Sequence, residues 1–223
     1  MSALDQPDDE ALPPFEVLAP SQQTVPLVFV SPHSGADYPA EFLAGSALDP
    51  VTLRRSEDSF VDELFAAAPQ VGAPLLRANF PRAYLDPNRE PWELDPAMFD
   101  GPLPDHVNSE SQRVAGGLGT IPRVVASGAE IYREKLSFAE AECRVNELYK
   151  PFHATLTTLI DETLEEFGCA VLIDCHSMPA VGGPMDKDRG HERLEIVLGD
   201  RFGTSCARAL TDAAEETLDE LGY

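Results

Sequence analysis

The stretch Cys169-Ala-Val-Leu-Ile-Asp174 decides the fold that this 223-residue chain is expected to adopt. It is a continuous apolar run without alternation of polar and apolar positions, and Gly168 precedes it. Such a run is typical of a central parallel strand that is covered on both faces. The sequence therefore predicts a sheet with residues 169–174 in its interior.

Three further strands are expected around this one. Val25-Pro-Leu-Val-Phe-Val30 is short, apolar and rich in β-branched residues. Pro74-Leu-Leu-Arg-Ala-Asn79 is expected to form a second strand. Leu194-Glu-Ile-Val-Leu198 follows the strand at 169–174. Each of these runs is bounded by residues that favour turns, as strands usually are.

Helices are expected between the strands. Residues 50–68 and 130–167 place apolar side chains at helical spacing, and Pro151 should kink or divide the longer helix. A third amphipathic helix is expected over residues 203–221, ended by Gly222. Alternating strands and helices predict an α/β fold, with a mixed, mostly parallel sheet flanked by helices.

The same reading gives the expected domain organisation. Residues 1–14 resemble a flexible acidic leader, and residues 15–223 are expected to form a single α/β domain. Residues 87–129 are rich in Pro, Gly and Asp, which predicts a long surface excursion. Because the alternation calls for another strand after Tyr223, we expect that the domain lacks a C-terminal segment.

The charge of the chain argues against two classes of partner. It has 16 Lys and Arg against 39 Asp and Glu, for a formal net charge of −23. Nucleic-acid binding needs cations that displace counterions from phosphates, and an anionic membrane surface would repel this chain. We therefore expect a small-molecule ligand and neither a nucleic acid nor a membrane, and the sequence does not give the oligomeric state.

The lack of a targeting signal and the spacing of the cysteines predict a cytoplasmic protein. The first 30 residues show no basic region followed by an apolar one, and no apolar run approaches the ~20 residues that span a bilayer. None of the four cysteines forms a CxxC pair. Their spacing suggests neither a zinc knuckle nor a disulfide framework.

Polar clusters follow three of the expected strands. They are Ser31-Pro-His-Ser-Gly35, the segment from Arg82 to Arg89, and Asp174-Cys-His-Ser-Met178. Ligands of open α/β sheets bind beyond the carboxyl ends of the strands. A parallel sheet would bring these three clusters to one edge.

His33 and His176 are candidate metal ligands because two histidines and one acid make a zinc site with an open position. Histidines at strand ends can also be purely structural. Spacing alone does not identify the acidic metal ligand. Glu57 and Asp58 begin an expected helical run, where an acid is commonly a helix cap. Asp174 could orient His176 through a hydrogen bond.

The segment Arg82-Ala-Tyr-Leu-Asp-Pro-Asn-Arg89 is the best candidate for anion binding. Arg89 can bind a carboxylate through two parallel hydrogen bonds, and Asn88 adds a neutral donor. A set of surface salt bridges would account for the segment equally well. Cys175 is a weak candidate nucleophile, because neighbouring strand residues point to opposite faces and it is expected to be buried.

Taken in order, these motifs resemble the N-formylglutamate amidohydrolase (deformylase) family. The resemblance rests on Ser31–Gly35, Ser56–Phe65, Phe80–Glu90, Ile173–Met178 and Leu198–Gly203. The family is distantly similar to zinc carboxypeptidases and to aspartoacylase-type enzymes. The resemblance thus implies a zinc-carboxypeptidase-like (phosphorylase/hydrolase-like) architecture.

The resemblance also implies roles for individual residues. It implies one zinc ion, or another divalent transition metal, held by His33, Asp58 and His176. It implies that Asn88 and Arg89 bind a substrate carboxylate and that Arg82 lies near the carbonyl under attack. Glu195 departs mildly from the aspartate expected there. The catalytic glutamate of the relatives would lie beyond residue 223.

The activity implied is hydrolysis of the formamide bond of N-formyl-L-glutamate to L-glutamate and formate, a step of histidine degradation. Two alternatives remain open from the sequence. One is a deacylase for another N-acyl amino acid, since a metal and arginines do not select the acyl group. The other is a non-catalytic, metal-dependent protein that binds dicarboxylates, which the missing general base motivates.

Overall fold

The computed structural model describes residues 12–183 and 187–223. The described residues up to Ser177 form one compact unit, and those from Met178 onward form a second. The single domain expected over residues 15–223 therefore stays a prediction. Residues 1–11 of the expected acidic leader lie outside the described part of the chain.

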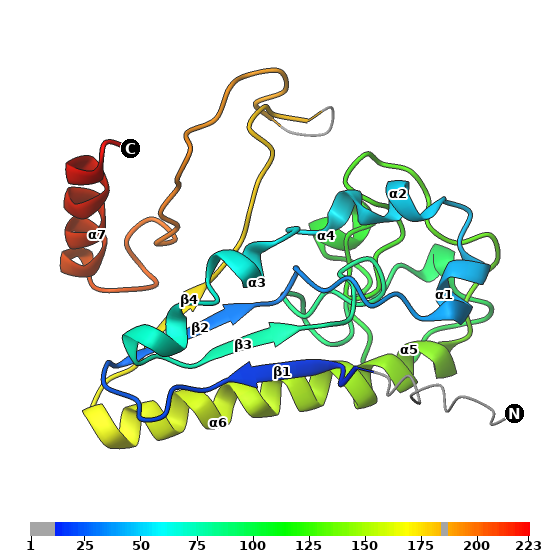
Figure 1. The fold of residues 1–223 in the computed structure, drawn as a ribbon. Coiled ribbons are helices and arrows are strands. Elements are labelled where there is room, and N and C mark those ends of the chain that lie inside the picture. The colour runs from blue at the N-terminus through cyan, green and yellow to red at the C-terminus, as the bar shows by residue number, and fades with distance from the viewer. Residues whose placement is uncertain (1–11, 184–186) are drawn as a thin grey trace, which may run out of the picture. The chain divides into compact units, whose positions relative to one another are not determined.

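The first unit is built on a four-stranded sheet (Figure 1). Its strands are β1 (Phe15–Leu18), β2 (Leu27–Ser31), β3 (Leu75–Ala78) and β4 (Val171–Asp174), in the order β1-β3-β2-β4. β2 runs parallel to both β3 and β4, whereas β1 is antiparallel to β3. This confirms the predicted α/β class with a mixed, mostly parallel sheet.

The position of β4 corrects one expectation. Among the described residues β4 pairs only with β2, so it is an edge strand and not the central one. Leu172 is 43% exposed, whereas Leu75 and Leu76 of β3 are fully buried. The predicted central position of β4 was wrong because an apolar run does not show how many neighbouring strands pair with it.

β1 was not expected from the sequence. It is a four-residue strand between Pro14 and Pro20, too short to show a clear alternating pattern. Its position is fixed by pairing with β3 and by Pro14, whose carbonyl oxygen accepts hydrogen bonds from the backbone of Asn79 and Phe80.

Helix α6 (Lys150–Phe167) packs along one face of the sheet (Figure 1). Phe152 lies at the centre of this contact, with its ring edge-on to Phe15 at 5.7 Å and to Phe80 at 6.1 Å. Burying such an aromatic side chain contributes about 1.5–3 kcal/mol. The opposite face of the sheet is covered where Phe29 of β2 meets Phe65, with ring centroids 5.8 Å apart.

The long helix predicted over residues 130–167 begins later and is divided. Ser137 caps α5 (Phe138–Arg144) in a capping box with Glu140, and a π-helical turn (η4, Val145–Tyr149) joins α5 to α6. The irregularity expected at Pro151 thus lies in the turn before it, and α6 continues through Pro151 itself. Proline has no N–H to donate, which favours a wider turn just before it.

The helix predicted over residues 50–68 is wrong. The region forms four short elements: α2 (Pro50–Leu53), the 3₁₀ turn η1 (Arg54–Ser56), α3 (Val61–Leu64) and the 3₁₀ turn η2 (Ala68–Val71). Phe60 is left-handed (φ 67°), and the backbone N–H of Asp58 donates to the carbonyl of His33 at 3.0 Å. This long-range bond replaces a helical one and holds Asp58 beside His33.

The excursion expected over residues 87–129 has few regular elements, as predicted. It contains η3 (Pro96–Met98) and α4 (Gln112–Ala115), and α1 (Ala40–Gly45) lies earlier in the chain. Its Leu94, Met98, Phe99 and Ile121 nevertheless form a buried cluster together with Leu136 and with Ala141 of α5. A packed core of this kind gives a loop region a defined conformation.

The second unit contains α7 (Arg208–Leu221), ended by the left-handed Gly222 as predicted. The helix starts at residue 208 and not at 203, because Arg201, Phe202 and Gly203 all have positive φ angles that a helix does not allow. The strand predicted at Leu194–Leu198 is wrong: these residues pair with no strand in the described part of the chain, and all five are exposed.

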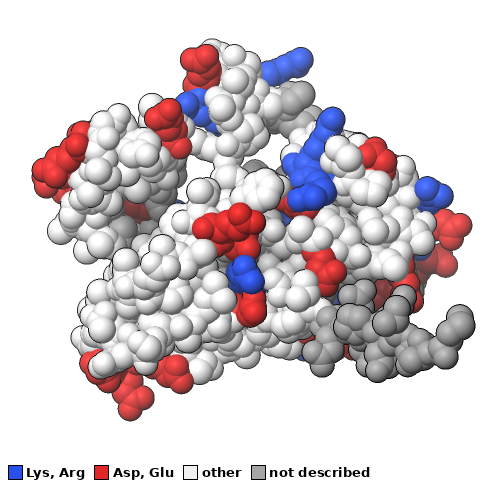
Figure 2. Space-filling model, in the orientation of Figure 1, with Lys and Arg blue, Asp and Glu red and all other residues white. Residues whose placement is uncertain are grey.

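The distribution of charged side chains and the hydropathy of the helices bear on the partners that the sequence excludes. On the face drawn in Figure 2, acidic and basic side chains are scattered, and the described residues show no broad basic patch there. Among the described helices, none combines the length and the apolarity that crossing a membrane requires. The expected lack of a nucleic-acid partner and the expected cytoplasmic location both stay predictions.

Candidate metal centre

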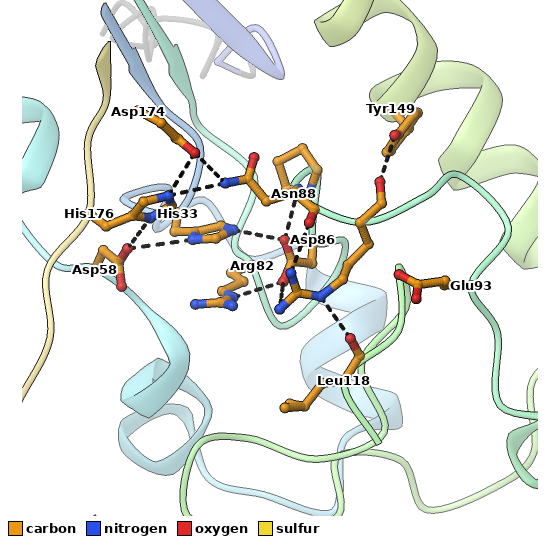
Figure 3. Close-up of polar contacts among 12 residues, drawn as sticks. His33, Asp58, Arg82, Asp86, Asn88, Glu93, Leu118, Tyr149, Asp174 and His176 are labelled. Atoms are coloured by element: carbon orange, nitrogen blue, oxygen red, sulfur yellow. Dashed lines mark hydrogen bonds and ion pairs between the residues drawn. The ribbon is translucent and has the colours of Figure 1, made fainter. Parts of the chain in front are cut away.

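The three polar clusters predicted at strand ends lie together in the first unit (Figure 3). His33 follows the end of β2 by two residues, and His176 follows the end of β4 by two residues. Because β2 and β4 are parallel neighbours, these positions meet at one edge, with the imidazole centroids 4.8 Å apart. The segment from Arg82 to Arg89 follows β3 and reaches the same place.

Asp58 lies between the two histidines. Its Oδ2 is 2.9 Å from His176 Nδ1 and 3.5 Å from His33 Nδ1. Ligand atoms of all three residues lie within 4.8 Å of one another. Two ligands about 2.1 Å from a tetrahedral zinc ion stand about 3.4 Å apart, so this spacing is close to that of a zinc shell.

Each histidine is supported on its far side by a second carboxylate. Asp86 Oδ1 lies 2.8 Å from His33 Nε2, and Asp174 Oδ2 lies 3.0 Å from His176 Nε2. When Nε2–H donates to such an acid, Nδ1 is left with a free lone pair that points to Asp58. Carboxylates behind histidines fix the tautomer and orientation of metal ligands in this way.

His33 Nδ1 gives the strongest indication of a missing partner. It is the buried side-chain polar atom without a hydrogen bond among the residues that the structure describes. His33 is only 2% exposed, so water does not readily satisfy this atom. A buried atom left unpaired costs about 1–3 kcal/mol, and a metal ion bound by Nδ1 removes that cost. The donor set therefore suits a divalent metal such as zinc.

The electrostatics of the cluster favour charged groups. Burial opposes the charge on His176, but hydrogen bonds and charges from Asp174 and Asp58 outweigh it and raise its pKa to about 9. Burial likewise opposes ionisation of Asp58, yet the two histidines hold its pKa well below the usual range. Asp58 is thus an ionised carboxylate at neutral pH.

Glu57, the other acid considered in this region, points elsewhere. Its carboxylate accepts hydrogen bonds from Tyr38 Oη at 2.7 Å, Ser59 Oγ at 2.9 Å and Arg54 Nε at 3.1 Å. These bonds join the chain turns on either side of Asp58. Of the two neighbouring acids, the geometry therefore places Asp58 with the histidines and gives Glu57 a supporting role.

Arg82 and Arg89 both contact Asp86 but differ in their free donors. All three guanidinium nitrogens of Arg89 have partners within the protein. Nε donates to the Leu118 carbonyl at 2.9 Å and Nη1 donates to the Asn88 carbonyl at 2.8 Å. Nη2 lies 3.3 Å from Asp86. Within residues 12–183 and 187–223, Arg82 has a partner only at Nε, which lies 3.0 Å from Asp86. Arg82 therefore has the donors that a ligand can reach first.

Asn88 lies beside the second histidine. Its Nδ2 donates to Asp174 Oδ2 at 2.8 Å and is 3.1 Å from His176 Nε2. Cys175 is buried, as expected, and burial next to Asp174 raises the pKa of its thiol to about 12. A thiol that remains protonated at neutral pH is a poor nucleophile.

The residue that sequence reasoning missed is Asp86. It joins the metal cluster to both arginines through contacts with His33, Arg82 and Arg89. The sequence feature that could have indicated it is its position, an acid within the segment from Arg82 to Arg89 that is otherwise typical of anion binding. Spacing alone does not show that such an acid faces a histidine 53 positions away.

Fold and site together define a class: an α/β protein with two histidines and one aspartate converging at the carboxyl edge of its parallel strands, the donor set of metal-dependent hydrolases. Comparison with known proteins gives the family. The model of the N-formylglutamate amidohydrolase family matches residues 25–223, and the chain belongs to that family.

Individual relatives are similar over much of the chain. The crystal structure of N-formylglutamate amidohydrolase from Ralstonia eutropha JMP134 superposes with a TM-score of 0.84 at 39% identity, covering 95% of this chain and 75% of that one. N-formylglutamate deformylase of Pseudomonas aeruginosa is 28% identical over 202 residues, 90% of this chain and 68% of its own length. The Pseudomonas putida deformylase is 24% identical over 165 residues, 73% of this chain, and the aligned region is 55% of its length.

Proposed function

We propose that the chain provides the metal site and the oxyanion-stabilising cation for hydrolysis of the formamide bond of N-formyl-L-glutamate, yielding L-glutamate and formate. The observation that carries the proposal is the unpaired Nδ1 of buried His33, which faces Asp58 together with Nδ1 of His176. The names of the relatives, N-formylglutamate deformylase and amidohydrolase, support the choice of substrate.

His33, Asp58 and His176 would hold one zinc ion. Bound zinc supplies two kinds of chemistry, a bound water of lowered pKa and polarisation of a carbonyl oxygen. The chain's own part is to keep three ligands in place, and Asp86 and Asp174 do so through Nε2 of each histidine. A metal ion bound by His176 would displace the proton that Asp174 and Asp58 favour there. Ionised Asp58 and two neutral histidines would then give the shell a charge of −1, which favours a dication.

Arg82 would stabilise the negative charge that develops on the formyl oxygen. Its Nε is bound to Asp86, which fixes the guanidinium, while Nη1 and Nη2 make no hydrogen bond or ion pair with the described residues. A preorganised donor of this kind is worth about 3–4 kcal/mol in a transition state. Asp86 is shared by His33 and Arg82, so one buried carboxylate sets their relative positions.

Asn88 and Arg89 remain our candidates for binding a substrate carboxylate. Asn88 is exposed and lies next to His176, which suits a side chain that meets substrate. Arg89 must first release both the Leu118 carbonyl and Asp86 to offer the two parallel donors Nε and Nη2. Binding of a carboxylate by Arg89 therefore requires a local rearrangement, whereas Arg82 needs none.

The test is formate release from N-formyl-L-glutamate by the protein expressed from its complete open reading frame and loaded with zinc. N-acetyl- and N-succinyl-L-glutamate, assayed in parallel, decide whether another acyl group is preferred. We expect the formyl compound to be the best substrate and His176→Ala to abolish turnover. Stoichiometric zinc with no release of formate would overturn the proposal.

A further inference from the structure

A cavity lies away from the metal cluster, within the first unit. Its volume is about 750 Å³, and it is bounded by α1, α5 and the chain between them. Its lining contains none of the residues assigned above to the metal or to Asp86 and its arginines. The side chains that matter for its chemistry are Phe42, Tyr84, Tyr132, Arg133, Lys135 and Arg144.

Arg144 is a buried cation in the wall of this cavity. It is only 7% exposed, and its guanidinium lies over the ring of Tyr84, 4.0 Å from the centroid. Its Nη1 donates to the Tyr84 carbonyl at 3.2 Å and to Tyr132 Oη at 2.8 Å. Stacking and two hydrogen bonds fix the orientation of the side chain but leave its charge without an acid, since the described residues place no carboxylate within ion-pair distance.

The unused side of Arg144 is the side that binds carboxylates. Nε and Nη2 form one edge of the guanidinium, and neither makes a hydrogen bond with a described residue. They are not sealed from solvent, because His33 Nδ1 is the one side-chain atom found both buried and unpaired in the described chain. Two parallel N–H groups on one edge match the two oxygens of a carboxylate.

Tyr132 adds a further donor next to the guanidinium, at its Nη1 nitrogen. Its oxygen accepts the bond from Arg144, and its own hydroxyl hydrogen has no acceptor among the described residues. Burial raises the pKa of this phenol, so the hydrogen is retained at neutral pH. A ligand oxygen next to Arg144 can therefore receive a third hydrogen bond.

The rest of the lining limits the kind of ligand. Arg133 and Lys135 contribute two positive charges, and the acids of the lining, Glu41, Glu134 and Glu140, contribute three negative ones. With Arg144 these charges sum to zero, so the cavity has no general attraction for polyanions. Aromatic walls from Phe42, Tyr84 and Tyr132 suit a flat or apolar body.

We propose that this cavity is a second binding site, for a small monocarboxylate with a flat or apolar body, whose carboxylate is bound by the Nε–Nη2 edge of Arg144 and the hydroxyl of Tyr132. The proposal is independent of the reaction at the metal cluster. A buried guanidinium without an acid is costly to keep, and a carboxylate ligand supplies the missing partner.

The test uses benzoate as the probe and isothermal titration calorimetry as the measurement. Benzoate should bind the purified protein, and the neutral isostere benzamide should not. Arg144→Lys keeps the charge but loses the two-donor edge, and we expect its Kd for benzoate to rise by at least about tenfold. Tyr132→Phe keeps the ring, and we expect a rise of about threefold or more.

Arg82→Ala is the matched control, because Arg82 offers free donors to an anion at the metal cluster. Benzoate affinity should be unchanged in this variant. The proposal is overturned if benzoate fails to bind at millimolar concentration, if Arg144→Lys binds as tightly as the parent chain, or if the loss follows Arg82→Ala instead. Circular dichroism checks that each variant is folded. If Arg144→Lys does not fold, the benzoate affinity of Tyr132→Phe tests the proposal.

A second measurement uses the chain's own cysteines. Cys143 lines the cavity and Cys169 does not, and both thiols are free and exposed. Benzoate should slow the reaction of Cys143 with a maleimide and leave that of Cys169 unchanged, as followed by peptide mass spectrometry. Equal rates at Cys143 with and without benzoate would contradict the proposed location.

Discussion

His33 and Asp86 form the contact that joins the two halves of the candidate site. Nε2 of His33 lies 2.8 Å from Oδ1 of Asp86, and both side chains are 2% exposed. The other oxygen of Asp86 faces the guanidinium groups of Arg82 and Arg89. One buried carboxylate thus orients a candidate metal ligand and two cations.

We predict from this contact that Asp86→Asn weakens zinc binding. Asparagine keeps the shape but can present an amide N–H to His33 Nε2, which favours the wrong tautomer and leaves Nδ1 protonated. Removing such a supporting carboxylate typically costs about 10–100-fold in metal affinity. Competition with a chromophoric chelator measures this affinity. Asp62→Asn, which disturbs only the ion pair with Arg77, is the control and should bind zinc as the parent does.

Replacing the neighbouring acids one at a time should separate their roles. Asp58→Ala removes the carboxylate between the two histidines, and we expect the purified protein to lose stoichiometric zinc. Glu57→Ala removes bonds to Tyr38 and Ser59 and should keep the metal, although its stability falls. Metal analysis of both variants gives the answer. A zinc-free Glu57→Ala with a zinc-loaded Asp58→Ala would reverse the assignment.

The two arginines should differ in kinetics. Arg82→Ala is expected to lower kcat by about 10²–10³-fold with little change in KM, because its free donors act on charge that develops in the transition state. Arg89→Ala is expected mainly to raise KM, because its proposed role is to bind a substrate carboxylate in ground and transition states alike. Steady-state kinetics on N-formyl-L-glutamate distinguish them. If both variants lost only kcat, the proposed role of Arg89 would be wrong.

Gly35 should tolerate no side chain. A Cβ at this position would overlap the backbone carbonyls of Asn79 and Phe80, which pack against it next to the metal cluster. We expect Gly35→Ala to lower the free energy of unfolding by about 1–3 kcal/mol, the usual cost of overpacking. Urea unfolding monitored by circular dichroism measures the change. Gly45→Ala is the matched control, because a Cβ there meets nothing within 4 Å, and it should leave stability unchanged or higher.

The sequence correctly predicted three strands and the polar residues that follow them, but not the strand at Leu194–Leu198. Apolar runs ending near Val30, Asn79 and Asp174 became β2, β3 and β4, because such runs must be buried and polar residues must leave the sheet. It failed where a distant residue changed the local preference. The expected helix over residues 50–68 is interrupted because Asp58 N–H donates to His33, a bond that no local pattern reveals.

The sequence by itself thus determined the α/β class, the histidines at two strand ends and the arginine-rich segment after a third. Only the tertiary structure decided which groups face one another: Asp58 with His176 across 118 positions, and Asp86 with His33 across 53. Side-chain periodicity depends on neighbours a few residues away, whereas these contacts depend on strand order and on the break before α3. Arg144 shows the same limit, since its place in a long helix was visible but the aromatic cavity around it was not.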